Sequence, residues 1–558
     1  MAPPPSAPRL ERLAPWLGGL LLALPVLVAK YPPMADLPLH EASVGLLRHW
    51  GDPRFAPPTL YFLNLGHSNQ LFSLLVLVLS FAFPIGWASK IVVAGSLVGL
   101  PVAAARFADH VGAPRWTALL VAPVGLGWLF FWGLVQNILG LVALLALLPS
   151  IDRFAARPTA KGALWMCGAM VLFHFAHQAM QLVALMAVVL CSLGAPLRDA
   201  KGMALRAAPV LFCGAVVYAA SVYAWHFAGP LHRATMQFRW TSLPYKLETI
   251  SGVLFAGYET YVRHLMLLLA SVPLVLFAIE RVRSRPMEGG LPWAARMREW
   301  RFELLALALL SLYLAAPSTI KSTTLVYHRF LPPAWAILAV AGASRTARVA
   351  AFLPRALCAT LPLASLLIAW PTFVDSNQVY SDLEVLMPKI EPGSAVMALN
   401  LGPDQPNRLW SPMVAAGHVV AVKGGRSLFD YTQSPVSPVS QRPEKIWVEP
   451  LARLELHPLR MRPGWDLTRF RYFLLATPRP TRAAAVTLAL RDEATLIGSQ
   501  GDWYLFESRL PLVPIDADDA PLPTPRPPTL RAKANEILHE ARELVDEPAG
   551  SAAGEEAR

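Results

Sequence analysis

The sequence predicts a predominantly α-helical protein: a polytopic membrane helix bundle with a small α/β domain near its C-terminus. Three observations predict this class. Of 558 residues, 55% are hydrophobic and only 15% are charged, whereas a soluble domain usually carries about a quarter charged residues. Apolar runs of about 17–25 residues, the length that spans a bilayer, recur through the first two thirds of the chain. After residue 372 the composition becomes that of a soluble domain.

The apolar runs give twelve candidate spans. The first follows Arg9 and Arg12 and resembles a signal peptide, but the sequence after it, Lys30-Tyr31-Pro32, is a poor cleavage site, so we expect an uncleaved helix. The candidates are 13–29, 70–85, 91–107, 116–132, 134–150, 162–177, 178–194, 208–227, 263–280, 302–318, 330–345 and 355–371.

The basic loops decide how many of these segments cross. Twelve crossings would place basic loops on alternating sides, against the positive-inside rule. If 70–85 lies along the outer surface instead, the short basic loops all fall inside. We therefore predict about eleven crossings of the inner (plasma) membrane plus one outer interfacial or re-entrant helix, with a cytoplasmic N-terminus and an extracytoplasmic C-terminal domain. Segment 70–85 is apolar nearly all round, although an interfacial helix should be amphipathic.

Three parts of the chain are expected. Residues 1–372 form the transmembrane domain with a long outer loop at 30–90, residues 373–510 a small α/β domain, and residues 511–558 a Pro-rich linker with a polar tail that is disordered or helical. In the α/β domain, short apolar runs predict strands, and 481–491 suits a helix. The expected strands are Ser394–Leu399, His418–Val422, Tyr472–Ala476 and Trp503–Phe506.

Composition also excludes several functions. The net charge of +12 does not indicate nucleic-acid binding, because the basic residues lie in short loops between hydrophobic runs. All four cysteines lie in apolar stretches, so we predict neither a disulfide framework nor a thiolate metal site. The sequence contains no P-loop, no Gly-x-Ser-x-Gly elbow and no His-Glu-x-x-His motif.

Acidic residues follow the first span almost at once. Asp36 and His40 are spaced i, i+4, so on a helix they would share one face, and Glu41 comes next. Asp36 either caps that helix or acts as a general base that activates an acceptor hydroxyl. A divalent cation held by Asp36, His40 and His67 is a further alternative that no diagnostic spacing supports, and no other cofactor is indicated.

Basic residues before a late span are candidates for phosphate binding. Lys321, His328 and Arg329 lie in this stretch, and a phosphate at a membrane surface needs cationic partners, of which Arg supplies a planar fork. Alternatively, Arg329 extends to the lipid head groups from the end of a span.

Three further polar residues are candidates for a substrate cavity. His174 flanks a tight outer turn, Asn137 lies at the tip of a short hairpin, and Arg239 stands between aromatic residues in the loop 228–262. The alternatives are an interfacial histidine, turn chemistry and an aromatic belt, respectively.

Together these features resemble the GT-C superfamily of integral-membrane glycosyltransferases, especially bacterial members that use polyprenyl-phosphate sugars. The resemblance covers roughly residues 13–372. It is carried by Asp36-x-Pro38-x-His40 after the first span, by the long outer loop that leads into an apolar helix, by Gly133-Leu134-Val135-Gln136-Asn137 between close-set spans, and by Ala316-Pro317 followed by Tyr327-His328-Arg329.

The resemblance implies an extracytoplasmic active site in which Asp36 is the general base and basic residues hold the phosphate of a polyprenyl-phosphate-linked sugar donor. The acceptor is unknown and lies outside the cytoplasm. Many members have two adjacent acids in this loop, whereas the second acid here, Glu41, is five residues away. Two alternatives remain: a transporter or flippase of a lipid-linked glycan intermediate, and a non-catalytic membrane scaffold of the cell envelope.

Overall fold

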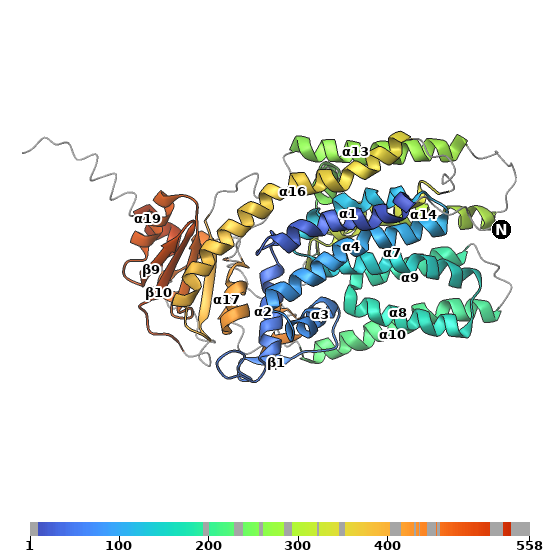
Figure 1. Ribbon diagram of the computed structural model, residues 1–558. Helices are drawn as coiled ribbons and strands as arrows, with labels where there is room; N and C mark the ends of the chain where they lie inside the picture. The colour runs from blue at the N-terminus through green and yellow to red at the C-terminus, as the bar shows by residue number, and fades with distance from the viewer. Residues whose placement is uncertain are drawn as a thin grey trace, which may run out of the picture.

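The computed structural model describes residues 9–193, 200–227, 238–255, 260–283, 293–320, 323–344, 352–401, 414–428, 431–434, 436–442, 454, 458–513 and 528–536. Most of these residues form helices that run side by side in a bundle, with a small sheet-containing domain beyond one end of it (Figure 1). The bundle helices are α1 (Arg9–Val28), α4 (Ile85–Val111), α7 (Val135–Ala156), α8 (Ala160–Ala176), α9 (Gln178–Leu193), α10 (Ala200–Phe227), α13 (Thr260–Arg283), α14 (Trp293–Ala315), α15 (Leu331–Ala341) and α16 (Phe352–Leu386).

The helices of the bundle have the lengths and the apolar composition of membrane-spanning helices. Six helices of the described chain are long and apolar enough to cross a bilayer. Within segment 70–85, helix α3 (Leu71–Ser80) has ten residues and spans about 15 Å at 1.5 Å per residue, half of a hydrocarbon core of about 30 Å. Ile85 already belongs to α4. Helix α3 is therefore too short to cross, while the total of eleven crossings stays a prediction.

The expected span 116–132 is interrupted. It consists of η1 (Arg115–Val121), α5 (Ala122–Gly125) and α6 (Trp128–Phe131). Gly127 separates the last two helices, and a Cβ there would lie 2.4 Å from the carbonyl oxygen of Leu254. The chain thus bends where another backbone approaches.

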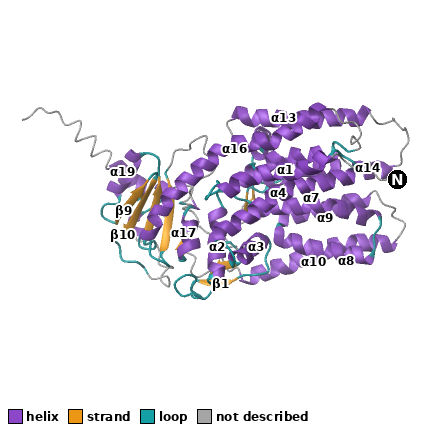
Figure 2. Ribbon diagram, viewed as in Figure 1, coloured by secondary structure: helices purple, strands orange, loops and turns teal. Residues whose placement is uncertain are grey.

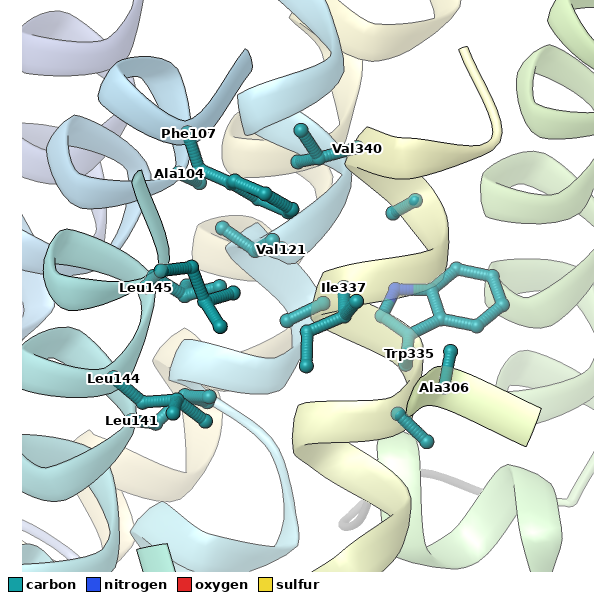
Figure 3. Packing of buried hydrophobic residues seen from close by; sticks show 14 of the residues in the cluster. Ala104, Phe107, Val121, Leu141, Leu144, Leu145, Ala306, Trp335, Ile337 and Val340 are labelled. Carbon is teal, nitrogen blue, oxygen red and sulfur yellow. The ribbon is translucent and has the colours of Figure 1, made fainter. Parts of the chain in front are cut away.

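Large apolar side chains fill the middle of the bundle, where Phe107 of α4, Leu144 of α7 and Ile337 of α15 pack together (Figure 3). Trp335 of α15 is buried beside them, and its indole nitrogen donates a hydrogen bond of 2.9 Å to the carbonyl of Leu120. The central position of α15 explains why it is apolar all round.

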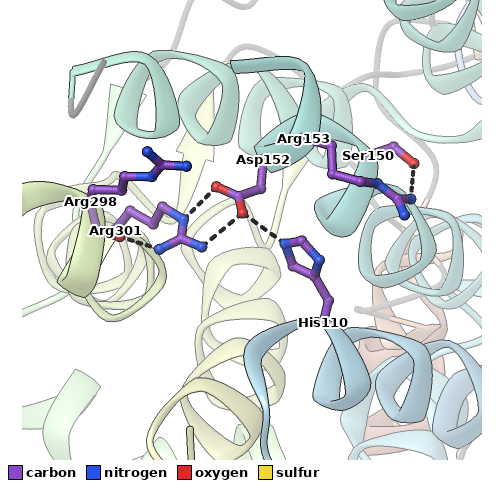
Figure 4. A network of polar contacts seen from close by, with 6 residues as sticks. All are labelled: His110, Ser150, Asp152, Arg153, Arg298 and Arg301. Carbon is purple, nitrogen blue, oxygen red and sulfur yellow. Dashed lines mark hydrogen bonds and ion pairs between the residues drawn. The ribbon is translucent and has the colours of Figure 1, made fainter. Parts of the chain in front are cut away.

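Buried charges tie the helices at the end of the bundle that carries the chain's N-terminus. The carboxylate of Asp152 in α7 accepts hydrogen bonds from Arg301 of α14, at 2.5 and 2.8 Å, and pairs with His110 of α4 at 2.7 Å (Figure 4). Each charge of this network has a partner, as a buried charge requires.

The C-terminal domain, defined here as the described residues between 387 and 513, is a mixed sheet with helices on both faces (Figure 2). Its strand order is β6-β5-β8-β10-β9, with β5 parallel to β6 and β8 and the other pairs antiparallel. The strands are β5 (Ala395–Asn400), β6 (Arg426–Ser427), β8 (Tyr472–Ala476), β9 (Ala494–Gln500) and β10 (Trp503–Ser508), and the helices are η4 (Met387–Lys389), α17 (Ala416–Lys423), η6 (Tyr431–Gln433), η8 (Pro458–Arg460), α18 (Pro463–Asp466) and α19 (Pro480–Ala489).

Three of the four expected strands are present, as β5, β8 and β10. The fourth expectation was wrong, because His418–Val422 lies within helix α17. A short apolar run fits a buried strand or a buried helix equally well. Here the packing of the segment against α2 (Leu37–Arg48) favours the helix. A Cβ on Gly417 would lie 2.6 Å from the carbonyl oxygen of Pro38, so α17 lies backbone-close to α2.

A helix and a strand also join this domain to the bundle. Helix α16 runs without a break across residue 372, the expected domain boundary, and its last turns contribute Tyr380 and Leu383 to the core under the sheet. In addition, β1 (Tyr61–Leu63) of the first loop, residues 30–84, pairs antiparallel with β7 (Val439–Gln441). The division at residue 372 stays a prediction. Of the expected tail, residues 530–536 are helical and Leu530 is buried in the domain core.

Smaller elements complete the end of the bundle that faces the C-terminal domain. They are a sheet of β2 (Phe238–Arg239), β3 (Thr319–Ile320) and β4 (Thr323–Thr324), the helices α11 (Leu243–Glu248) and α12 (Ile250–Leu254), and the turn of 3-10 helix η3 (Tyr327–Phe330).

Candidate active site beneath the C-terminal domain

Asp36 is held by the turn that precedes α7. Its backbone nitrogen donates to the carbonyl of Trp132 at 3.1 Å, and that of Ala35 donates to Phe131 at 2.9 Å. Gly133 has φ +76°, and a Cβ there would lie 2.6 Å from the backbone nitrogen of Asp36. Only glycine combines this conformation with so close an approach. The segment 131–133 therefore fixes the position of Asp36.

The Asp36 carboxylate does not cap α2, although Asp36 occupies the N-cap position. Its Oδ2 instead accepts a hydrogen bond of 3.1 Å from the hydroxyl of Tyr431 in η6. Burial raises the pKa of Asp36 to about 6, while the Tyr431 hydrogen bond and the charge of Arg329 act in the opposite direction. A carboxylate near this pKa is ionised at neutral pH and can accept a proton.

His40 lies between Tyr431 and α7. Its ring packs on Tyr431, with centroids 4.4 Å apart, and its Nδ1 accepts a hydrogen bond from Gln136 at 3.1 Å. Burial lowers the pKa of His40 to about 3, so the imidazole is neutral. His40 therefore holds the ring of Tyr431 in place without adding a charge to the site.

Arg329 brings a positive charge to Asp36. It lies in η3, just before α15, and its Nη1 is 3.4 Å from Nε2 of His177 at the turn between α8 and α9. Its Nε is buried without a hydrogen-bond partner within the described part of the chain. A guanidinium whose N–H donors are not all used can bind an anion such as a phosphate.

His328 lies in the same 3-10 turn as Arg329. Its ring stacks on Trp128 with centroids 4.6 Å apart and 9° between the planes. Lys246, buried nearby, caps α14 by donating to the carbonyls of Leu314 and Ala316. Burial, helped by the charges of Arg329 and Lys246, lowers the pKa of His328 to about 4.

Asn137 and His174 are buried at the same end of the bundle. Asn137 lies in the first turn of α7, and its Oδ1 has no hydrogen-bond partner among the residues that the structure describes. His174 lies in the last turn of α8, and its carbonyl accepts a hydrogen bond from the backbone nitrogen of Asn69 in the first loop at 3.1 Å. A buried amide oxygen without a partner costs free energy, which a bound hydroxyl would offset.

The remaining candidates lie apart from Asp36 or outside the described residues. Glu41, 6% exposed, forms an ion pair of 3.1 Å with Nδ1 of His418 in α17, so its carboxylate contacts the C-terminal domain. Arg239 is exposed on β2. Lys321 lies outside the described residues. The described residues contain no group of three or more His, Cys, Asp or Glu side chains that could hold a metal ion.

Tyr431 and Lys246 did not emerge from the sequence as candidates. Gln136 adjoins Asn137, and the sequence indicated both polar residues at this hairpin tip. Lys246 stands in an aromatic-rich loop that suggests a membrane interface equally well. Tyr431 carries no local signal, since its partner Asp36 lies 395 residues earlier.

Comparison with solved structures identifies the fold. The chain is similar to the crystal structure of ArnT from Cupriavidus metallidurans bound to undecaprenyl phosphate, with a TM-score of 0.51 and 11% sequence identity over 89% of this chain and 98% of that chain. ArnT is a GT-C glycosyltransferase. The protein is thus a multi-pass membrane protein with the GT-C fold, which confirms the expected fold class. No protein-family model and no curated protein sequence matches the chain.

Proposed function

We propose that this protein is a membrane glycosyltransferase that moves a sugar from a polyprenyl-phosphate carrier to an acceptor outside the cytoplasm. The observation that carries the proposal is the proximity of Asp36, whose pKa burial raises to about 6, to the buried Arg329, whose charge acts on it, beneath the C-terminal domain. The fold of ArnT, whose crystal structure contains undecaprenyl phosphate, supports a lipid phosphate as the ligand of such a site.

In this proposal Asp36 acts as the general base. An acceptor hydroxyl attacks the anomeric carbon of the sugar and loses its proton to the Asp36 carboxylate. The bond between the anomeric carbon and the phosphate oxygen breaks, and its electron pair leaves with the polyprenyl phosphate. The products are the glycosylated acceptor and the free carrier phosphate.

Arg329 and its neighbours hold the phosphate. The guanidinium balances the charge that develops on the leaving phosphate oxygen and offers it a planar pair of donors. Lys321 and His328 precede Arg329 in the chain, and His40 lies one helical turn after Asp36. We assign all three to the same donor site. Asn137, His174 and Arg239 are assigned to the sugar and the acceptor, whose hydroxyls need hydrogen-bond partners.

We assign Glu41 two roles, one in proton transfer and one in docking the C-terminal domain. As the second acid of the loop it is a candidate for proton transfer, and through His418 it holds the C-terminal domain against α2. No metal ion is required by this mechanism, in which the arginine carries the positive charge.

The distribution of basic residues supports the proposed orientation. Helices α8, α10, α14 and α16 start at the end of the bundle opposite to Asp36, and α4, α7 and α13 end there. These termini carry Arg106, Arg153, Arg157, Lys161, Lys201, Arg281, Arg283, Arg296, Arg298, Arg301 and Arg355. By the positive-inside rule that end faces the cytoplasm. The C-terminal domain and Asp36 are then on the extracytoplasmic side of the plasma membrane.

The test compares the envelope glycans and glycolipids of a deletion strain with those of the same strain carrying the wild-type gene. A transferase predicts that one glycoform disappears in the deletion and returns with the gene. Purified protein in liposomes, supplied with glycolipid extract from the deletion strain, should release free carrier phosphate. Translocation of the glycolipid without release would indicate a flippase, and an unchanged glycan profile would indicate a scaffold. Either result contradicts the proposal.

A further inference from the structure

The C-terminal domain places one side chain directly on Asp36. Tyr431, in η6, donates its hydroxyl hydrogen bond to Oδ2 at 3.1 Å. The Tyr431 ring is fixed as well, since it packs on His40, and His40 is itself bonded to Gln136 of α7. A side chain held at both its ring and its hydroxyl has little rotational freedom left to lose.

The segment that follows Tyr431 is docked on the first loop by polar contacts. Asn64 donates its side-chain amide to the carbonyl of Ser437 at 3.0 Å, and Gln70 donates to the carbonyl of Val436 at 3.1 Å. Strands β1 and β7 then pair from residue 439 onwards. The position of the Tyr431 hydroxyl is therefore set by the docking of the whole domain, which is the kind of support that a precise site needs.

We propose that Tyr431 is a positioning residue for Asp36, so that the C-terminal domain completes the transferase site. This inference rests on the proposed function. The hydrogen bond engages one of the two carboxylate oxygens and orients the other toward an incoming hydroxyl. It also stabilises the ionised carboxylate, the form that accepts a proton.

Among the described residues, Tyr431 from η6 and Arg329 from η3 act on the Asp36 carboxylate, and His40 from α2 packs on the Tyr431 ring. Burial and the nearby Asp36 charge hold the pKa of Tyr431 well above its ordinary value, so its hydroxyl stays protonated and can donate. Burial lowers the pKa of His40 to about 3, so His40 does not titrate near pH 6. A loss of activity on acidification near pH 6 would thus report on Asp36.

The experiment measures kcat/KM against pH for wild type, Tyr431→Phe and Tyr61→Phe. Tyr61→Phe is the matched control, because its hydroxyl also joins the first loop to the C-terminal domain, at 2.6 Å to the carbonyl of Gly425, without touching Asp36. We expect Tyr431→Phe to move the acidic limb of the profile about one pH unit toward higher pH, since a charge-assisted hydrogen bond to the base is lost. Tyr61→Phe should leave the limb in place.

An unmoved acidic limb in Tyr431→Phe, whatever its maximal rate, would overturn the inference, because a purely structural role lowers activity without changing the base. The same holds if Tyr61→Phe moves the limb equally. These outcomes differ from a failure of the proposed function itself. In that case Asp36→Asn would be as active as wild type, and the profile would report on another group.

A second measurement is independent of catalysis. The thermal midpoints at pH 7.5 of wild type, Asp36→Asn, Tyr431→Phe and the double variant form a double-mutant cycle. We expect the Asp36→Asn shift in midpoint to be larger in the Tyr431→Phe background, where the ionised carboxylate has lost its donor. Additive shifts would contradict a direct bond between the two side chains.

Discussion

Gly133 lies so close to Asp36 that a single added Cβ would sit 2.6 Å from the backbone nitrogen of Asp36. The turn before α7 and the start of α2 therefore form one rigid unit, in which the residue type at 133 determines where the carboxylate lies. The approach joins two segments almost a hundred residues apart in the sequence.

This contact makes Gly133→Ala a test of how precisely Asp36 must be placed. The substitution both strains a backbone with φ +76°, which costs about 1–2 kcal/mol, and pushes Asp36 aside. A displacement of about 1 Å at a reacting group costs roughly 100-fold in rate, so we expect kcat to fall by about that factor. The matched control is Gly51→Ala, which has φ +88° and nothing within 4 Å of its Cβ. Equal losses in the two variants would assign the effect to strain alone.

The raised pKa of Asp36 also predicts how stability depends on pH. Folding raises this pKa from 3.8 to about 6, so the ionised carboxylate destabilises the folded state above pH 6, and this penalty disappears below about pH 4. Asp36→Asn removes the charge. We expect it to raise the thermal midpoint at pH 7.5, by a margin that shrinks to nothing as the pH falls toward 4. Asp52→Asn, at an exposed acid of the same loop, should show no such trend.

Arg329 is expected to act on the lipid phosphate. Arg329→Gln keeps polar atoms at the site but removes the charge, and loss of a buried charge-assisted contact costs about 2–3 kcal/mol, or roughly 30- to 150-fold in affinity. The measurement is binding of undecaprenyl phosphate to the purified protein in nanodiscs. The control is Arg54→Gln, an exposed arginine of the first loop. Wild-type affinity in Arg329→Gln would remove Arg329 from the phosphate site.

The close packing of α17 on α2 predicts that the C-terminal domain can be loosened by one methyl group. In Gly417→Ala the new Cβ would meet the carbonyl oxygen of Pro38 at 2.6 Å, and overpacking of this kind costs about 1–3 kcal/mol. We expect faster proteolysis of the domain and reduced activity, since Tyr431 moves with it. Gly464→Ala, in α18 of the same domain, has open space around its Cβ and should behave as wild type. Identical digestion of both variants would show that the helices can separate without consequence.

The fold was predictable from hydropathy because long apolar helices are a property of local sequence. Segment 70–85 marks a limit of this approach, since a window average does not register that Pro84 precedes a new helix, and the apolar run divides into α3 and the start of α4. His418–Val422 marks another, because the choice of helix there depends on the contact between Gly417 and Pro38.

The candidate site was predictable only in part. Asp36, His40 and Arg329 are chemically distinctive residues next to apolar spans, and the structure brings all three together around Tyr431. Tyr431 itself is one tyrosine of thirteen, and nothing near it in the sequence distinguishes it. The role of Tyr431 depends on how the C-terminal domain docks on the bundle. No local sequence pattern indicates that docking.

The most direct measurement compares transfer by wild type, Asp36→Asn and Asp52→Asn at pH 7.5, with the donor extracted from the deletion strain and protein amounts matched. We expect Asp36→Asn to lose at least 100-fold in rate, in keeping with the loss of a general base, and Asp52→Asn to retain the wild-type rate. Transfer by Asp36→Asn at the wild-type rate would show that Asp36 does not accept the proton.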